Sequence, residues 1–136
     1  MPATTGGFMD IRKAYVIDAP AAAVWTALTD PDVIERWGGG PADMAAEPDF
    51  AFSLWGGSIF GTVIEVDPLR SMVQEWYGGN WDDPSIARFT LSTGAGGTLL
   101  ELENSGVPDE DAADIDAGWD DYYLGPIKAL LEGRQA

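Results

Sequence analysis

The stretch 109–133, DEDAADIDAGWDDYYLGPIKALLEG, decides the fold of this chain. Its large apolar residues recur at steps of three and four positions, and aspartates fill many of the positions between them. The apolar set is Ile115, Trp119, Tyr122, Tyr123, Ile127, Leu130 and Leu131. This spacing predicts an amphipathic helix with one broad aromatic face. We expect the helix to cover a sheet and the functional site to lie between the two.

The chain before this helix is predicted to form mostly strands. The expected strands span 11–17, 50–55, 58–66, 71–77, 85–92 and 98–104, with 43–47 as a weaker candidate. Short turns such as Gly56-Gly57 join them, which favours antiparallel pairing. Two short helices are expected after the first strand, beginning near Pro20 and Pro31.

The two faces of the predicted sheet differ. In the last strand Leu100 and Leu102 lie on one face, whereas Glu101 and Glu103 lie on the other and should face water. One face of the sheet is therefore expected to be covered by helices and the other to be exposed to solvent. The predicted fold class is α+β, with a curved antiparallel sheet of about six or seven strands wrapped around a long C-terminal helix.

The length of 136 residues fits one domain. Residues 1–10 are predicted to be a flexible leader and residues 11–134 a single domain. The N-terminal residues lack the charged and apolar regions of a signal peptide, and no stretch approaches the ~20 apolar residues of a membrane span. We therefore predict a cytoplasmic protein without a membrane span.

Composition excludes several functions. The chain has 23 acidic and 7 basic residues and a formal net charge of −16, which disfavours nucleic-acid binding. It contains no histidine and no cysteine, so Ser-His-Asp triads, thiolate nucleophiles, and imidazole or thiolate metal sites are excluded. An enzyme would need a tyrosine, a carboxylate of raised pKa or a bound water. Catalysis is therefore the least favoured function, and no catalytic residue is predicted.

Two further patterns do not match known sites. The acidic cluster that begins at Asp109 lacks the spacing of a calcium-binding loop, because the twelfth position counted from Asp114 is Gly125. The glycine-rich pieces match neither a phosphate-binding nor a dinucleotide-binding pattern, and they are interpreted as turns. No metal and no cofactor is predicted.

Four segments in register resemble the activator-of-heat-shock-protein-90-ATPase-like family, within the START/polyketide-cyclase/birch-pollen-allergen-like (SRPBCC) superfamily. They are IDAPAAAVWTALTDPDVIERW (17–37), GTVIEVDPLR (61–70), GGTLLELENSGVP (96–108) and GWDDYYLGPIKALLEG (118–133). The resemblance implies the helix-grip fold, with an apolar cavity between sheet and helix that the superfamily uses for lipids, sterols, polyketides and hormones. It also implies a chaperone as a second kind of partner.

The residues expected to line the cavity come from the helix face and the covered sheet face. They are Trp76, Trp119, Tyr122, Tyr123, Ile127, Met72, Leu100, Leu102, Asn104 and Arg88. The helix aromatics fit plain core equally well. Asn104 is expected near the rim, at the end of its strand. Arg88 is either a surface ion-pair partner of Glu75 or an anion anchor in the cavity.

The favoured hypothesis is a stand-alone domain that binds a small, mainly apolar or aromatic molecule under the C-terminal helix. Gly125-Pro126 predicts a bend in that helix, because Pro126 has no N–H to bond the carbonyl of Tyr122. The alternative is a chaperone-associated interaction module. A homodimer is compatible with either hypothesis.

Overall fold

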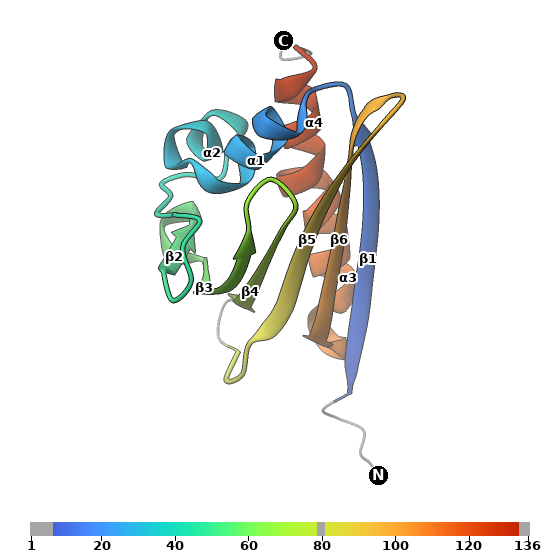
Figure 1. The fold of residues 1–136 in the computed structure, drawn as a ribbon. Coiled ribbons are helices and arrows are strands. Elements are labelled where there is room, and N and C mark those ends of the chain that lie inside the picture. Colours follow the sequence, from blue (N-terminus) through green and yellow to red (C-terminus); the bar gives the residue numbers. More distant parts are fainter. Residues whose placement is uncertain (1–6, 79–80, 134–136) are drawn as a thin grey trace.

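The computed structural model describes residues 7–78 and 81–133. The chain forms a six-stranded antiparallel sheet in the order β1-β6-β5-β4-β3-β2, with a long C-terminal helix lying across one face (Figure 1). The strands are β1 (Phe8–Ile17), β2 (Ala51–Leu54), β3 (Ile59–Asp67), β4 (Ser71–Gly78), β5 (Ser85–Gly94) and β6 (Gly97–Pro108). The helices are α1 (Ala21–Thr29), α2 (Pro31–Trp37), η1 (Trp55–Gly57), α3 (Asp109–Gly118), η2 (Trp119–Leu124) and α4 (Gly125–Leu131).

This architecture confirms the predicted fold class. The elements α3, η2 and α4 follow one another without a break and together form a C-terminal helix of 23 residues. Below, "C-terminal helix" means these three elements. The short helices α1 and α2 lie beside α4 at one end of the sheet (Figure 1).

Local chemistry explains the two short helices. Pro31 occupies the first turn of α2, where its missing N–H is not needed, and the Asp30 carboxylate accepts a hydrogen bond of 2.8 Å from the Asp32 N–H. Gly38 ends the helix with a φ of 106°, a conformation that glycine adopts without strain.

The core lies between the concave face of the sheet and the C-terminal helix. Side chains that alternate along the strands point inward, and those of Phe89, Met72 and Leu100 are almost completely buried. On the opposite face of β6, Glu101 is exposed, as predicted. The largest inward side chains of the C-terminal helix are Trp119 and Tyr123, at 2% and 1% exposure.

Several predicted boundaries were wrong. β1 begins at Phe8 rather than Ile11, and β6 continues to Pro108 rather than ending at Asn104. The additional residues of β1 pair with the additional residues of β6, since Phe8 lies opposite Pro108. The weak strand at 43–47 is only a single bridge between Asp43 and Ser53. Residues 1–6 of the predicted leader and Arg134 lie outside the described residues.

The C-terminal helix contains a π-helical segment, η2, just before the predicted bend. The Gly125 N–H bonds to the Asp120 carbonyl, five residues back, instead of the usual four. Two neighbouring residues favour this geometry. Pro126 offers no N–H to Tyr122, and Gly125 has no Cβ, which would lie 2.3 Å from the Asp120 oxygen.

Because of the π-helical turn, the predicted apolar face of the C-terminal helix was partly wrong. Each such turn holds one extra residue, so positions four and five apart share a face. Leu124 is consequently buried below Trp119, although it was not predicted to belong to the apolar face. Tyr122, which was predicted to belong to it, is 67% exposed.

Candidate ligand-binding pocket

A pocket of about 470 Å³ lies between the C-terminal helix and the β3–β4 side of the sheet. Its walls come from η1 and the start of β3, from β4, and from α3 with η2. The lining residues are Trp55, Ser58, Ile59, Trp76, Asp114, Ile115, Gly118, Trp119, Tyr122 and Tyr123. Half of them are aromatic. The exposed Asp114 and Tyr122 place the mouth of the pocket along α3 and η2.

The aromatic rings of the wall are packed against one another. The Trp76 and Trp119 rings stack with centroids 5.0 Å apart, and Trp119 lies 4.7 Å from Tyr123. Tyr123 in turn meets Trp55 edge-on at 6.0 Å, with 70° between the planes. Such contacts add to the energy of area burial and hold each ring in one orientation. These ring contacts join the parts of the pocket wall that come from η1, β4 and η2.

A buried hydrogen-bond chain fixes Trp119. Its indole N–H donates to the Asn104 side-chain oxygen at 3.0 Å, and the Asn104 amide donates to the Ser85 hydroxyl at 2.9 Å. Ser85 donates to the Trp76 carbonyl at 2.9 Å, so the chain runs from helix to β4. Asn104 is fully buried, and its predicted place at the rim was wrong because β6 extends four residues further.

Three buried polar atoms have no hydrogen-bond partner in the described part of the chain. They are the side-chain oxygen of Gln74, the indole nitrogen of Trp76 and the hydroxyl of Tyr123. Burial raises the pKa of Tyr123 well above its usual range, so this hydroxyl stays neutral. Two of the three side chains, Trp76 and Tyr123, belong to the pocket wall. Unpaired buried groups of this kind are rare in folded proteins.

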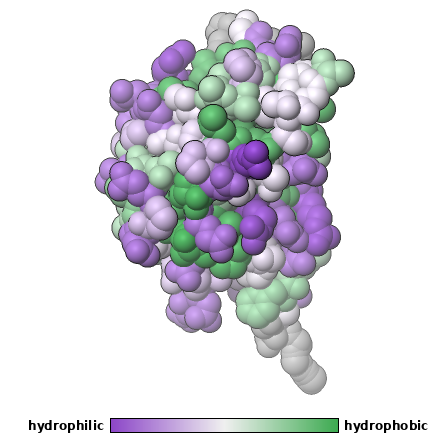
Figure 2. Space-filling model, viewed as in Figure 1, coloured by the Kyte–Doolittle hydropathy of each residue, from purple (hydrophilic) through white to green (hydrophobic). Residues whose placement is uncertain are grey.

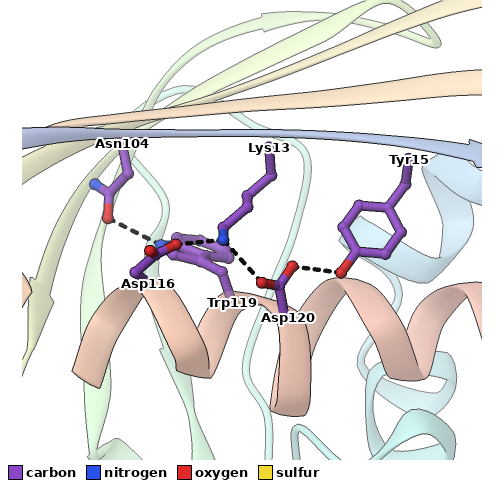
Figure 3. A network of polar contacts seen from close by, with 6 residues as sticks. All are labelled: Lys13, Tyr15, Asn104, Asp116, Trp119 and Asp120. Atoms are coloured by element: carbon purple, nitrogen blue, oxygen red, sulfur yellow. Dashed lines mark hydrogen bonds and ion pairs between the residues drawn. The ribbon is translucent and has the colours of Figure 1, made fainter. Parts of the chain in front are cut away.

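The C-terminal helix is tethered to β1 by charged groups. Lys13 lies in ion pairs with Asp116 and Asp120, and its Nζ is 2.8 Å from the Asp120 oxygen Oδ2. The Tyr15 hydroxyl donates to the other Asp120 oxygen at 2.5 Å. Figure 3 shows Asp116 and Asp120 projecting from the helix toward β1, with the Trp119–Asn104 bond beside them. Trp119 and Asp120, neighbours in η2, thus hold the helix to two strands.

These tethers explain three pKa shifts. Burial lowers the pKa of Lys13, but the hydrogen bonds and charges of Asp116 and Asp120 outweigh it, and the net shift is upward. Hydrogen bonds from Lys13 and Tyr15 lower the pKa of Asp120. Burial, together with the Asp120 carboxylate, raises the pKa of Tyr15 above its usual range. All three shifts favour the charge states that form the tether at neutral pH.

We predict that Asp120→Asn lowers the free energy of unfolding by on the order of 1 kcal/mol at pH 7, because the pair is partly exposed. A depressed carboxyl pKa contributes stability that is present above the unfolded pKa of 3.8 and lost as pH falls through the folded pKa. The difference between the wild-type protein and the variant should thus hold near neutral pH and shrink below about pH 4. Urea unfolding at several pH values measures it. The control is Asp83→Asn, a substitution in an exposed loop. If the stability difference between this variant and the wild-type protein depended on pH in the same way, the prediction would be contradicted.

The structure brings together four of the ten predicted cavity residues. Trp76, Trp119, Tyr122 and Tyr123 lie in the pocket wall. Met72, Leu100, Leu102 and Ile127 are buried core residues that do not line the pocket, as is Asn104. Arg88 is exposed on the convex face, opposite Val73 in register rather than Glu75.

Several side chains of the pocket wall and of the tether were not predicted from the sequence. Trp55, Ile59 and Ile115 complete the apolar wall, and Asp114 supplies its carboxylate. The Lys13–Asp116–Asp120 tether was also missed, although two signals pointed to it. Lys13 lies on the same strand face as Tyr15, and the two aspartates are four residues apart, which places them on one side of a helix.

The surface carries both polar and apolar residues. Figure 2 shows one face as largely hydrophilic, with hydrophobic residues gathered in its middle. Within residues 7–78 and 81–133, no helix has the length and apolar content needed to cross a membrane. The same residues contain no cluster of three or more acidic side chains arranged to hold a metal ion.

A curved sheet gripping one long helix, with a pocket between them, defines a helix-grip protein. The family model "Activator of Hsp90 ATPase homolog 1-like protein" matches residues 18–132. The chain therefore belongs to the activator of Hsp90 ATPase homolog 1-like family, within the SRPBCC superfamily.

Individual proteins are also similar to this chain. An uncharacterized protein of Schizosaccharomyces pombe is 29% identical over 124 residues, which are 90% of this chain and 37% of that protein. A mouse protein named activator of 90 kDa heat shock protein ATPase homolog 2 is 25% identical over 90% of this chain and 38% of its own length. The chain thus spans little more than a third of these relatives. The crystal structure of protein MLL2253 from Mesorhizobium loti has a TM-score of 0.81 at 25% identity, covering 94% of this chain and all of that one.

Proposed function

We propose that this protein binds a small, mainly apolar molecule in the pocket between the C-terminal helix and the sheet. The observation that carries the proposal is the pocket itself, about 470 Å³ in volume and walled by three tryptophans and two tyrosines. This volume lies within the ~300–1,000 Å³ range of small-molecule sites. The Trp76 N–H and the Tyr123 hydroxyl, which lack a hydrogen-bond partner among the described residues, belong to two side chains of this wall.

Gly118 offers a direct test. It lines the pocket, and a Cβ added there meets no atom within 4 Å. A leucine at this position should therefore occupy the pocket without displacing the backbone. We expect Gly118→Leu to abolish binding while the free energy of unfolding stays equal or rises, since glycine is a poor helix former.

The matched control is Ala117→Leu, at the neighbouring exposed position of the same helix. It adds a similar side chain on the solvent side and should leave binding unchanged. Binding is followed by tryptophan fluorescence and native mass spectrometry with a panel of apolar compounds. Equal affinities of the wild-type protein and Gly118→Leu for every bound compound would place binding elsewhere and overturn the proposal.

A second candidate function is association with a chaperone of the 90 kDa heat-shock class. It is supported by the similarity to the mouse activator homolog, which extends over 90% of this chain. A pull-down with the cognate chaperone and an ATPase assay would test it. If the chaperone neither binds the protein nor changes its ATPase rate at low salt, this candidate function is refuted.

A further inference from the structure

The pocket wall is rich in π-electron surface. Trp55, Trp76, Trp119, Tyr122 and Tyr123 all contribute to it. Their planes differ, from 25° between Trp76 and Trp119 to 70° between Trp55 and Tyr123. An occupant surrounded by rings in several planes can meet ring faces as well as edges. The face of an aromatic ring is its electron-rich side and attracts cations.

The charge around the pocket has a single sign. Asp114 supplies a carboxylate to the lining, and neither lysine nor arginine is among the described residues that line it. Lys13, on the β1 side of the same helix, is already engaged by Asp116 and Asp120. The chain as a whole carries a formal charge of −16. This field attracts cations to the mouth of the pocket and repels anions.

We propose that the ligand of this pocket is an organic cation, an amine or quaternary ammonium attached to an apolar or aromatic body. The inference rests on the proposed function and adds the charge of the ligand to it. The ammonium group lies at the mouth, near Asp114 and Tyr122, and the apolar body reaches inward to Trp76 and Trp119. A carboxylate or phosphate ligand would face Asp114 with no basic lining side chain to compensate for it.

Three ligands of similar shape and different charge separate the effect of ligand charge on affinity from the effect of ligand size. They are (4-hydroxyphenyl)trimethylammonium, its neutral isostere 4-tert-butylphenol, and anionic 4-hydroxybenzenesulfonate. Calorimetric titration of the wild-type protein gives each affinity. We expect the cation to bind about five- to tenfold more tightly than the neutral isostere, as cation–π attraction and the Asp114 charge together imply. The anion should bind most weakly of the three, and added salt should weaken the binding of the cation alone.

Asp114→Asn removes the carboxylate with little change in shape, and Asp114 is exposed, so the fold should persist. We expect this variant to lose about two- to fivefold in affinity for the cation and none for 4-tert-butylphenol. Asp121→Asn makes the same change of net charge on the same helix, away from the pocket lining, and should leave both affinities unchanged.

The outcomes distinguish this inference from the proposed function. If 4-tert-butylphenol binds as tightly as the cation and Asp114→Asn has no effect, the inference is overturned, whereas small-molecule binding stands. If Asp121→Asn lowers the affinity for the cation as much as Asp114→Asn does, the overall charge of the protein rather than the pocket explains why the cation is preferred to the neutral isostere. The inference then fails. If none of the three probes binds at millimolar concentration, the inference fails, and the comparison of the wild-type protein with Gly118→Leu for the panel of apolar compounds decides the proposed function separately.

Discussion

Replacing Trp119 by alanine is expected to lower the free energy of unfolding by about 3–5 kcal/mol, the largest effect of any single change considered for this protein. The side chain is 2% exposed, stacks on Trp76 and touches Phe89 and Tyr123. Its removal leaves a cavity. It also leaves the buried Asn104 oxygen without its donor, which adds to the loss. Urea unfolding followed by circular dichroism measures the change.

Two further variants separate the contributions to this loss. Trp119→Phe keeps most of the ring area but removes the indole N–H, so we expect a loss of about 1–3 kcal/mol from the unpaired Asn104 oxygen. Tyr122→Ala removes a neighbouring aromatic side chain that is 67% exposed and should change stability by no more than about 0.5 kcal/mol. A loss in Tyr122→Ala as large as that in Trp119→Ala would contradict the packing described here.

Gly125→Ala is expected to destabilise the protein by about 1–3 kcal/mol, although alanine is ordinarily the better helix former. The added Cβ would lie 2.3 Å from the Asp120 carbonyl oxygen, which accepts the π-helical hydrogen bond from Gly125 itself. The neighbouring backbone must therefore shift, and Asp120 moves relative to Lys13 and Tyr15. Chemical unfolding gives the loss of stability, and amide chemical shifts of β1 report the movement.

The control for Gly125→Ala is the other glycine of the same helix. Gly118→Ala meets nothing within 4 Å and should stabilise the protein by up to about 1 kcal/mol. The two substitutions are chemically identical, and their predicted effects have opposite signs. Stabilisation by both substitutions would show that helix propensity, and not the π-helical geometry, governs these positions.

The fold could be predicted from sequence because its signals are local. Alternation along β4 and β6 and the apolar spacing of the C-terminal helix fixed the elements, and the turn glycines gave antiparallel connections. The end of β6 could not be predicted in this way. Gly106 and Pro108 are poor strand residues, and the segment is held in the sheet by its pairing with Phe8 and Met9 and by the burial of Val107.

The site was only half predictable for a related reason. Large aromatic residues are usually buried, so the sequence could predict that Trp76, Trp119 and Tyr123 lie in the interior. In contrast, the π-helical turn depends on one missing N–H and one missing Cβ, and it rotated Tyr122 outward. The roles of Asn104, Lys13 and Asp114 depend on which elements come together, information that a one-dimensional pattern of polarity does not contain.

The tether between β1 and the C-terminal helix also constrains the order of folding. Lys13 and Asp120 are 107 positions apart in the chain, and Tyr15 and Asp120 are 105 apart. Closing so long a loop is entropically unfavourable, and contacts of this range slow folding. During synthesis, β1 leaves the ribosome long before the helix that it must hold. β1 can therefore form this contact only after Asp120 has been synthesised, and the pocket wall is complete only when the C-terminal helix has formed.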